Sequence, residues 1–238
     1  MVLELNALQT GVHLLPLSVA LLVTALAVPR LAPRASPRRV VRLGIVAMLA
    51  GTVVLIGGLD PGANAGIVLI PMALIGIGIG ALASQLGAVT VSAVADDRSP
   101  EVGGLQNTFT NFGASLGTAL VGAVLIGSLT RTFLSGAGHN AAIPPGVTAQ
   151  ATVQLESGVP FASDTDLRRQ LATTDLPPTT QDAIVAESAA ARLVGLRTAL
   201  WLVALLSVVS LFFTGMLPTR PTGEGPEPLD DDTRSTVG

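Results

Sequence analysis

A long run of residues without charge constrains most strongly what this chain can fold into. Residues 105–129 contain no Asp, Glu, Lys, Arg or His. At a rise of about 1.5 Å per helical residue, about 20 apolar residues are enough to cross a bilayer core of about 30 Å. The run therefore predicts a membrane-spanning helix, and the rest of the chain is organised around it.

The first half of this span is rich in polar side chains. They are Gln106, Asn107, Thr108, Thr110, Asn111 and Ser115, and they lie among Phe109, Phe112 and Leu116. Unpaired amides that face lipid carry a large desolvation penalty, so this half is expected to face other helices or a water-filled path. Two interpretations remain open here, a structural seam between helices and direct contact with a substrate.

The second half of the span carries small residues four positions apart, which are Gly113 with Gly117, Ser115 with Ala119, and Thr118 with Gly122. Small side chains let helix backbones approach closely, and van der Waals packing is a main source of helix association in lipid. We therefore expect Gly113, Gly117 and Gly122 to pack against a neighbouring helix.

Composition assigns the whole chain to the integral membrane proteins. Of its 238 residues 49% are apolar and only 12% charged, against about 25% charged in soluble domains. Cysteine is absent, which excludes disulfides, thiolate metal sites and cysteine nucleophiles. The net charge of -3 argues against nucleic acid as a partner. No H-E-x-x-H motif, G-x-S-x-G motif or carboxylate pair within a span is present, so we expect neither an enzyme nor a bound metal or cofactor.

The pattern along the chain predicts an all-α, polytopic bundle of about five transmembrane helices. Region 1–134 is expected to hold four helices, at about 12–28, 43–59, 66–94 and 105–129. Residues 135–192 read as a long extracytoplasmic loop, 193–217 as the last helix, and 218–238 as a disordered acidic tail. Within the loop, Pro177 and Pro178 signal the start of a helical pattern that is compatible with continuation into the last span.

Arginines without neighbouring acids predict the orientation. The loop after the first span contains Arg30, Arg34, Arg38, Arg39 and Arg42. Short arginine-rich loops stay in the cytoplasm, so these residues are the expected topology anchor of a multi-pass protein of the cell (plasma) membrane. Five crossings then place the C-terminus in the cytoplasm and the N-terminus outside. Because the N-terminus lacks a basic signal-peptide region, we expect further spans upstream.

Alternating glycines mark the third span. Gly78 and Gly80 belong to a G-x-G-x-x-A pattern, which in dinucleotide-binding proteins follows a strand and opens a helix. Here the pattern lies in the middle of an apolar span. We therefore interpret Gly76, Gly78 and Gly80 as sites of close helix packing, with Ser84 and Gln85 facing an interior.

Three stretches resemble the major facilitator superfamily, in its branch of fourteen-helix drug:proton antiporters. Residues 8–16 (L-Q-T-G-V-H-L-L-P) look like the entry to the second helix of that family's C-terminal six-helix bundle. Residues 76–80 look like its glycine-rich fourth helix, and residues 103–108 with 111–119 look like its fifth. One departure is that residues 33–39 keep arginines but lack the acid and the glycine of the family's inner loops. A gating salt bridge at this loop is therefore in doubt.

The resemblance implies part of a secondary transporter that exports amphipathic small molecules in exchange for protons. Its partners would be the bilayer and a missing N-terminal bundle, in the same chain or a partner chain. Because no ionisable residue lies deep inside any span, proton-carrying groups would come from that other bundle. The candidate substrate path consists of Gln85, Asn107, Thr108 and Asn111 as polar lining, with Phe109, Phe112 and Met72 as apolar surface. The alternative is a truncated or regulatory membrane protein that associates with other helices and transports nothing.

Overall fold

The described part of the chain is almost entirely helical. The computed structural model describes residues 7–31, 35–59, 65–92, 99–146 and 164–217. Helix accounts for 91% of these residues and none of them forms a strand. Five of the helices are long and apolar enough to cross a membrane. The predicted all-α class with about five spans is therefore confirmed, and the chain is a multi-pass membrane protein.

The described elements are five long helices and three short ones. Their bounds are α1 Ala7–Leu31, α2 Pro37–Gly58, the short 3-10 helix η1 Ala65–Val68, α3 Leu69–Ser92, α4 Ser99–His139, α6 Asp164–Leu171, α7 Pro178–Phe213 and the 3-10 helix η3 Thr214–Met216. Pro37 and Pro178 occupy the first turn of α2 and α7, where proline lacks only a hydrogen bond that the helix start does not need. The acidic tail 218–238 lies outside the described residues.

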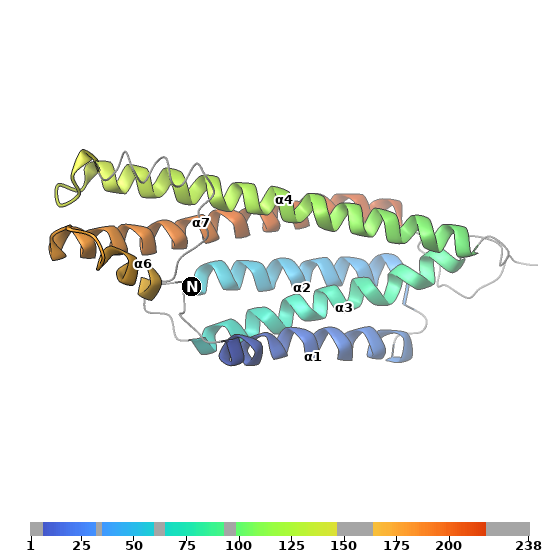
Figure 1. Cartoon of the computed structure of the whole chain (residues 1–238). Helices are drawn as coiled ribbons and strands as arrows, with labels where there is room; N and C mark the ends of the chain where they lie inside the picture. Colours follow the sequence, from blue (N-terminus) through green and yellow to red (C-terminus); the bar gives the residue numbers. More distant parts are fainter. Residues whose placement is uncertain (1–6, 32–34, 60–64, 93–98, 147–163, 218–238) are drawn as a thin grey trace, which may run out of the picture.

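The helices pack side by side in an order that differs from their order in the chain. α3 lies between α1 and α2, α2 also packs against α7, and α7 packs against α4 (Figure 1). The apolar 18-residue segment of α1 that could span a membrane contains no buried residue, and the same is true of α4. These two helices are therefore the flanks of the arrangement, and most of their side chains are open to lipid or to further protein.

Two hydrogen bonds join α7 to the two ends of α2. Arg42 Nε donates to Thr214 Oγ1 at 2.9 Å, where α7 ends in η3. At the other end of α2, the Arg197 guanidinium donates to the backbone carbonyl of Leu59. A cation suits the negative end of a helix, where the last carbonyls have no partner within the helix. The segment of α7 between the two contacts is about 26 Å long at 1.5 Å per residue, which is close to the bilayer-core thickness of about 30 Å.

α4 and α7 are both longer than a membrane requires. α4 has 41 residues and α7 has 36, which correspond to about 60 Å and 54 Å of helix. At one end they extend past α1, α2 and α3 and pair with each other, and α6 packs there against α7 (Figure 1). We call this part the extension, and define it as residues 131–146 with 164–192.

The extension corrects the prediction that residues 135–192 form a long loop. α4 continues to His139, α6 covers Asp164–Leu171, and α7 begins at Pro178. The helical pattern after Pro177 and Pro178 is confirmed, because α7 runs without a break into the last span. Residues 147–163 lie outside the described part, so the loop prediction stays untested there.

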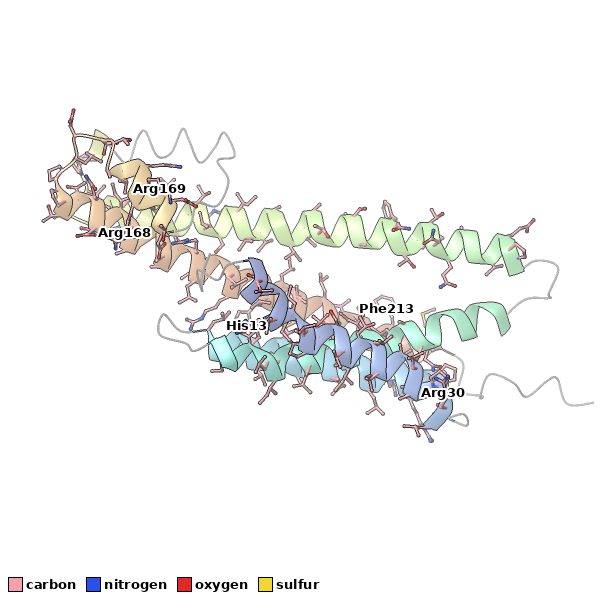
Figure 2. All side chains as sticks on the ribbon, turned by 60° about the horizontal axis from the view of Figure 1, so that its bottom comes forward. His13, Arg30, Arg168, Arg169 and Phe213 are labelled. Carbon is pink, nitrogen blue, oxygen red and sulfur yellow. The ribbon has the colours of Figure 1, made fainter. Side chains whose placement is uncertain are left out.

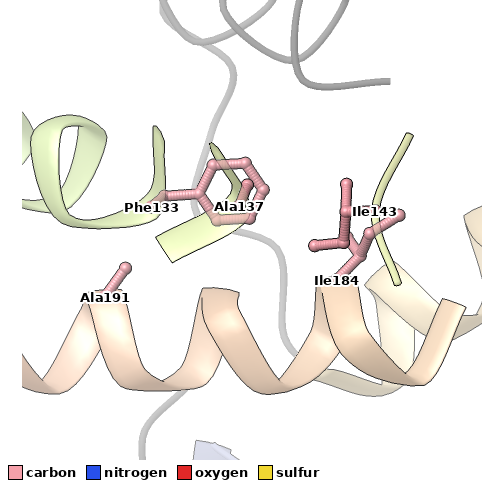
Figure 3. Close-up of a cluster of buried hydrophobic side chains, with 5 residues drawn as sticks. All are labelled: Phe133, Ala137, Ile143, Ile184 and Ala191. Atoms are coloured by element: carbon pink, nitrogen blue, oxygen red, sulfur yellow. The ribbon is translucent and has the colours of Figure 1, made fainter. Parts of the chain in front are cut away.

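A small apolar core explains why these polar segments are helical. Phe133 and Ala137 of α4 pack with Ile184 and Ala191 of α7 and with Ile143 just after α4 (Figure 3). Polar contacts surround this core: Thr180 Oγ1 donates to the Ala142 carbonyl at 2.8 Å, and the guanidinium of buried Arg192 pairs with Asp164 of α6. Burial of one side of each helix stabilises helices that their composition alone would leave marginal.

Candidate functional site

The N-terminal half of α4 carries an amide pair. Asn111 Nδ2 donates to the Asn107 carbonyl oxygen at 2.9 Å and to Asn107 Oδ1 at 3.1 Å. Both side chains are exposed, and from Pro100 to Leu120 no residue is buried. The amides are therefore partly satisfied by their own helix, but their remaining donors and acceptors face outward with no partner among the described residues.

This amide pair lies on the face of α4 that contacts α7 further along the helix. Leu125 and Leu129 follow Asn107 and Asn111 by about five full turns, at 3.6 residues a turn. Leu125 and Leu129 lie against Gly195 of α7, whose added Cβ would be 3.1 Å from the Leu125 carbonyl oxygen. The same face is thus covered by α7 in one half of α4 and uncovered in the other.

The other candidate path residues of α4 surround the amide pair. Thr108 Oγ1 donates to the Gly104 carbonyl at 3.0 Å, so its hydroxyl is occupied by the helix itself. Phe109 and Phe112 are 67% and 64% exposed. At about 100° per residue they point away from Asn107 and Asn111, so this half of α4 has an amide face and a phenyl face. The structure brings these five candidates together on two helical turns.

Gln85 and Met72 are not part of that group. Gln85 is buried, and its Nε2 donates to Ser84 Oγ at 3.3 Å. It follows by one turn Ala81, which meets Gly44 of α2, so it lies on the packed side of α3. Met72 is half-buried near the start of α3, about 20 Å along the helix from Gln85. Among the described residues, no hydrogen bond joins either residue to the polar half of α4.

The alternating glycines of α3 serve two different neighbours. A Cβ added to Gly76 or Gly80 would come closer than 3.0 Å to the backbone of Leu17 or Leu21 in α1, respectively. A Cβ added to Gly78 would collide instead with the Gly44 carbonyl in α2. Residues two apart on a helix lie about 200° apart, so glycine at every second position lets α3 approach a helix on each side. This geometry agrees with the packing interpretation of the motif.

The three glycines of α4 that were expected to pack against a helix have no such neighbour among the described residues. A Cβ on Gly113, Gly117 or Gly122 would meet nothing within 4 Å. The helix that these residues were expected to contact is therefore not among the described residues. Together with the open amide pair, these glycines make the N-terminal half of α4 an uncovered surface with the composition of a helix interface.

The arginines expected as a topology anchor lie at one end of the bundle. Arg30 is in the last turn of α1, where its Nη1 donates to the Leu26 carbonyl at 2.9 Å. Arg38, Arg39 and Arg42 are in the first two turns of α2. Arg34 falls outside the described residues. The positions fit a membrane boundary, whereas the side of the membrane stays a prediction.

The chemistry available at the uncovered face is hydrogen bonding and apolar contact. Residues 105–129 hold no ionisable side chain, so this part of α4 cannot itself carry a proton through the membrane. Among the described residues no group of three His, Asp or Glu side chains is placed to hold a metal ion. The face is suited to a helix or to an amphipathic molecule with both an apolar body and hydrogen-bonding groups.

No protein-family model matches this chain, and no curated protein or solved structure matches it either.

Sequence reasoning missed the polar contacts that hold the helices in place. The contact of Arg197 with Leu59 and the ion pair of Arg192 with Asp164 both join residues far apart in the chain. One signal was present. The helical pattern that begins after Pro178 is compatible with continuation through Arg192 and Arg197 into the last span, which places both arginines on one helix. No local pattern, however, indicates which carbonyl or carboxylate they reach.

Proposed function

We propose that this chain supplies one helical bundle of a secondary active transporter that exports amphipathic organic compounds in exchange for protons. The observation that supports it is the amide pair Asn107 and Asn111, which continues the interhelical face of α4 beyond the reach of α7. Hydrocarbon cannot satisfy the free donors and acceptors of these amides, so a second bundle or a water-filled path is expected opposite them.

In this proposal a second bundle, from the same polypeptide or from a partner chain, faces α4. Secondary transporters alternate access by rocking two bundles around a site near the midplane of the membrane. The uncovered amide face would form one wall of that site, while Phe109 and Phe112 offer apolar surface on the adjoining side of α4. The protonatable groups would be supplied by the second bundle, because residues 105–129 of α4 hold none.

The proposal also includes the location of the protein. The arginine-bearing ends of α1 and α2 would face the cytoplasm, in a plasma membrane, because short loops rich in arginine are retained on that side. The end of α7 at η3 lies beside Arg42, so the C-terminus would be cytoplasmic as well. The extension would then lie outside the cell.

The test is export from energised membrane vesicles by the full-length polypeptide that contains this chain. Asn107→Leu with Asn111→Leu removes the amide face, and Gln170→Leu is the matched control on exposed α6. A hydrogen bond within a membrane averages about 0.6 kcal/mol, so each lost contact should weaken apparent affinity for a polar amphipathic substrate about threefold. Unchanged export and unchanged substrate preference in the double variant would remove this assignment.

A second candidate is a membrane protein that associates with other helices and transports nothing. The open positions of Gly113, Gly117 and Gly122 favour it, since they are typical of a helix-packing surface. The two candidates separate in the same vesicles. Export that disappears when the proton gradient is collapsed supports the transporter. Absence of export for every amphipathic compound tried, with a stable complex at α4, supports the second candidate.

A further inference from the structure

One end of the bundle carries a cluster of positive charge with little compensation. The cluster consists of Arg30 at the end of α1 and Arg38, Arg39 and Arg42 at the start of α2. Figure 2 shows Arg30 at the same end of the molecule as Phe213 of α7, and far from Arg168 and Arg169 of the extension. We call these four residues the arginine cluster.

Carboxylates do not neutralise this cluster within the described part of the chain. The salt bridges found there, Arg168 with Asp182, Arg169 with Asp166 and Arg192 with Asp164, all belong to the extension. Of the described acidic residues, only Glu101 at the start of α4 lies outside the extension, at the end of the bundle that carries the arginine cluster. It forms no ion pair with the cluster. Within the described part of the chain, the cluster therefore carries a net positive charge that can attract an external anion.

One guanidinium group of the cluster is held in place at the junction of α2 and η3, and a second lies beside it. Arg42 Nε donates to Thr214 Oγ1 at 2.9 Å, and Arg38 lies one turn away, with its Nη2 3.6 Å from where a Cβ of Gly215 would be. Arg38 Nε is buried and has no hydrogen-bond partner among the described residues. Arg39 is exposed on the adjoining side of α2. Arginine presents five donors, so most of the donors of this cluster remain available.

Apolar side chains continue from the cluster into the membrane region. Leu43 is 69% exposed and Val46 is 47% exposed, one and two turns beyond Arg39 on the same face of α2. Across the junction, Phe212 and Met216 of α7 and η3 are 81% and 85% exposed. A charged group at the end of a helix, followed by an exposed apolar stripe, is the arrangement that a phospholipid complements, with its phosphate at the arginines and its acyl chain along the stripe.

We propose that the arginine cluster binds the headgroup of an anionic phospholipid. Its phosphate accepts hydrogen bonds from Arg39 and Arg42, and an acyl chain lies along Leu43 and Val46. The net charge of the cluster favours a headgroup with net negative charge over a zwitterionic one. The interaction also joins α2 to the end of α7, because Arg42 already contacts Thr214. Anionic lipid should therefore stabilise the packing of these two helices.

The test uses the full chain in lipid nanodiscs of phosphatidylcholine, with or without phosphatidylglycerol. Native mass spectrometry counts retained phosphatidylglycerol per chain, and the midpoint of thermal unfolding is measured in the same discs. Each arginine near an anionic surface contributes about 1 kcal/mol, which is about a fivefold change in affinity. Arg39→Gln with Arg42→Gln should therefore reduce phosphatidylglycerol retention about 25-fold and abolish its effect on the midpoint.

Two controls make the result decisive. Arg168→Gln with Arg169→Gln removes the same charge from the extension and should leave retention unchanged. The Arg39 side chain forms no hydrogen bond or ion pair with the described residues, so a fivefold loss in the Arg39→Gln variant excludes misfolding as the cause. Equal retention by the wild-type chain and the double variant would overturn the proposal.

Two other outcomes would also overturn it. Displacement of the lipid by millimolar inorganic phosphate would show a site for free anions. The tail after η3 carries Glu224, Glu227 and three consecutive aspartates. Phosphatidylglycerol binding that occurs only after deletion of residues 218–238 would show that this acidic tail, and not lipid, occupies the cluster in the intact chain.

Discussion

Gly76 of α3 is the position where the smallest change of sequence should have the clearest effect on packing. The Gly76→Ala variant adds a Cβ closer than 3.0 Å to the backbone carbonyl group of Leu17 in α1. A backbone atom cannot rotate away as the end of a side chain can, so α1 must move as a whole. Overpacking of this kind costs about 1–3 kcal/mol. The ratio of folded to unfolded protein should fall by about 5-fold to 150-fold.

The control is Gly57→Ala on α2, where an added Cβ meets nothing within 4 Å. Alanine favours helix over glycine by about 0.8–1 kcal/mol, so this variant should be neutral or slightly more stable. Gly80 faces the same helix α1 one turn away. The double variant of Gly76 and Gly80 should therefore lose less than the sum of the two single effects, because the first substitution already displaces α1.

The assay is reversible unfolding of the purified chain in mixed micelles, followed by helical circular dichroism during titration with a denaturing detergent. Helix content at the start of each titration shows whether the variant folds. If Gly76→Ala and Gly57→Ala unfold at the same detergent fraction, the close approach of α1 to α3 is not the reason for glycine in this motif, and the packing argument fails.

Three further substitutions test the polar and apolar contacts of α7, the first by the same detergent unfolding and the other two by separate measurements. Arg197→Ala removes the donor to the Leu59 carbonyl and should lower the free energy of unfolding by about 1.5–3 kcal/mol, whereas the control Arg169→Ala on exposed α6 should lower it by about 0–1 kcal/mol. Equal effects of the two substitutions would contradict the role of Arg197 at the end of α2. Phe133→Ala leaves a cavity in the core of the extension, so amide hydrogen exchange should become faster in residues 178–192 and stay unchanged in α2. Faster exchange throughout the chain would show that this core is not independent of the rest. Asp164→Ala leaves the buried guanidinium of α7 unpaired and should release α6, which limited proteolysis between α6 and α7 would detect; an unchanged cleavage rate would contradict the ion pair.

The polar residues of the spans show where prediction from sequence reached its limit. Asn107, Asn111 and Gln85 have similar amide side chains in apolar surroundings, and the sequence supports the same expectation for all three. The structure separates them: Gln85 is buried beside Ser84, whereas Asn107 and Asn111 are exposed. The difference depends on which side of each helix has a neighbour, and that information is not local.

The extension shows a second limit of a different kind. Composition made residues 135–192 look like a loop, because charged residues and prolines are frequent there. Their helices exist since Phe133, Ile184 and Ala191 bury one another, although they lie far apart in the chain. Only the start of α7 carried a local signal, in Pro177 and Pro178, and that part of the prediction is confirmed.

The sequence by itself determined that this protein is a bundle of about five membrane helices. The reason is local, because an apolar segment in hydrocarbon must satisfy its own backbone hydrogen bonds and only a helix does so within one segment. Only the tertiary structure decided which helices pack together, that Gly76 and Gly78 serve different neighbours, and that α7 covers half of α4. Those choices depend on contacts such as Arg197 with Leu59, whose free energy exists only once distant segments meet.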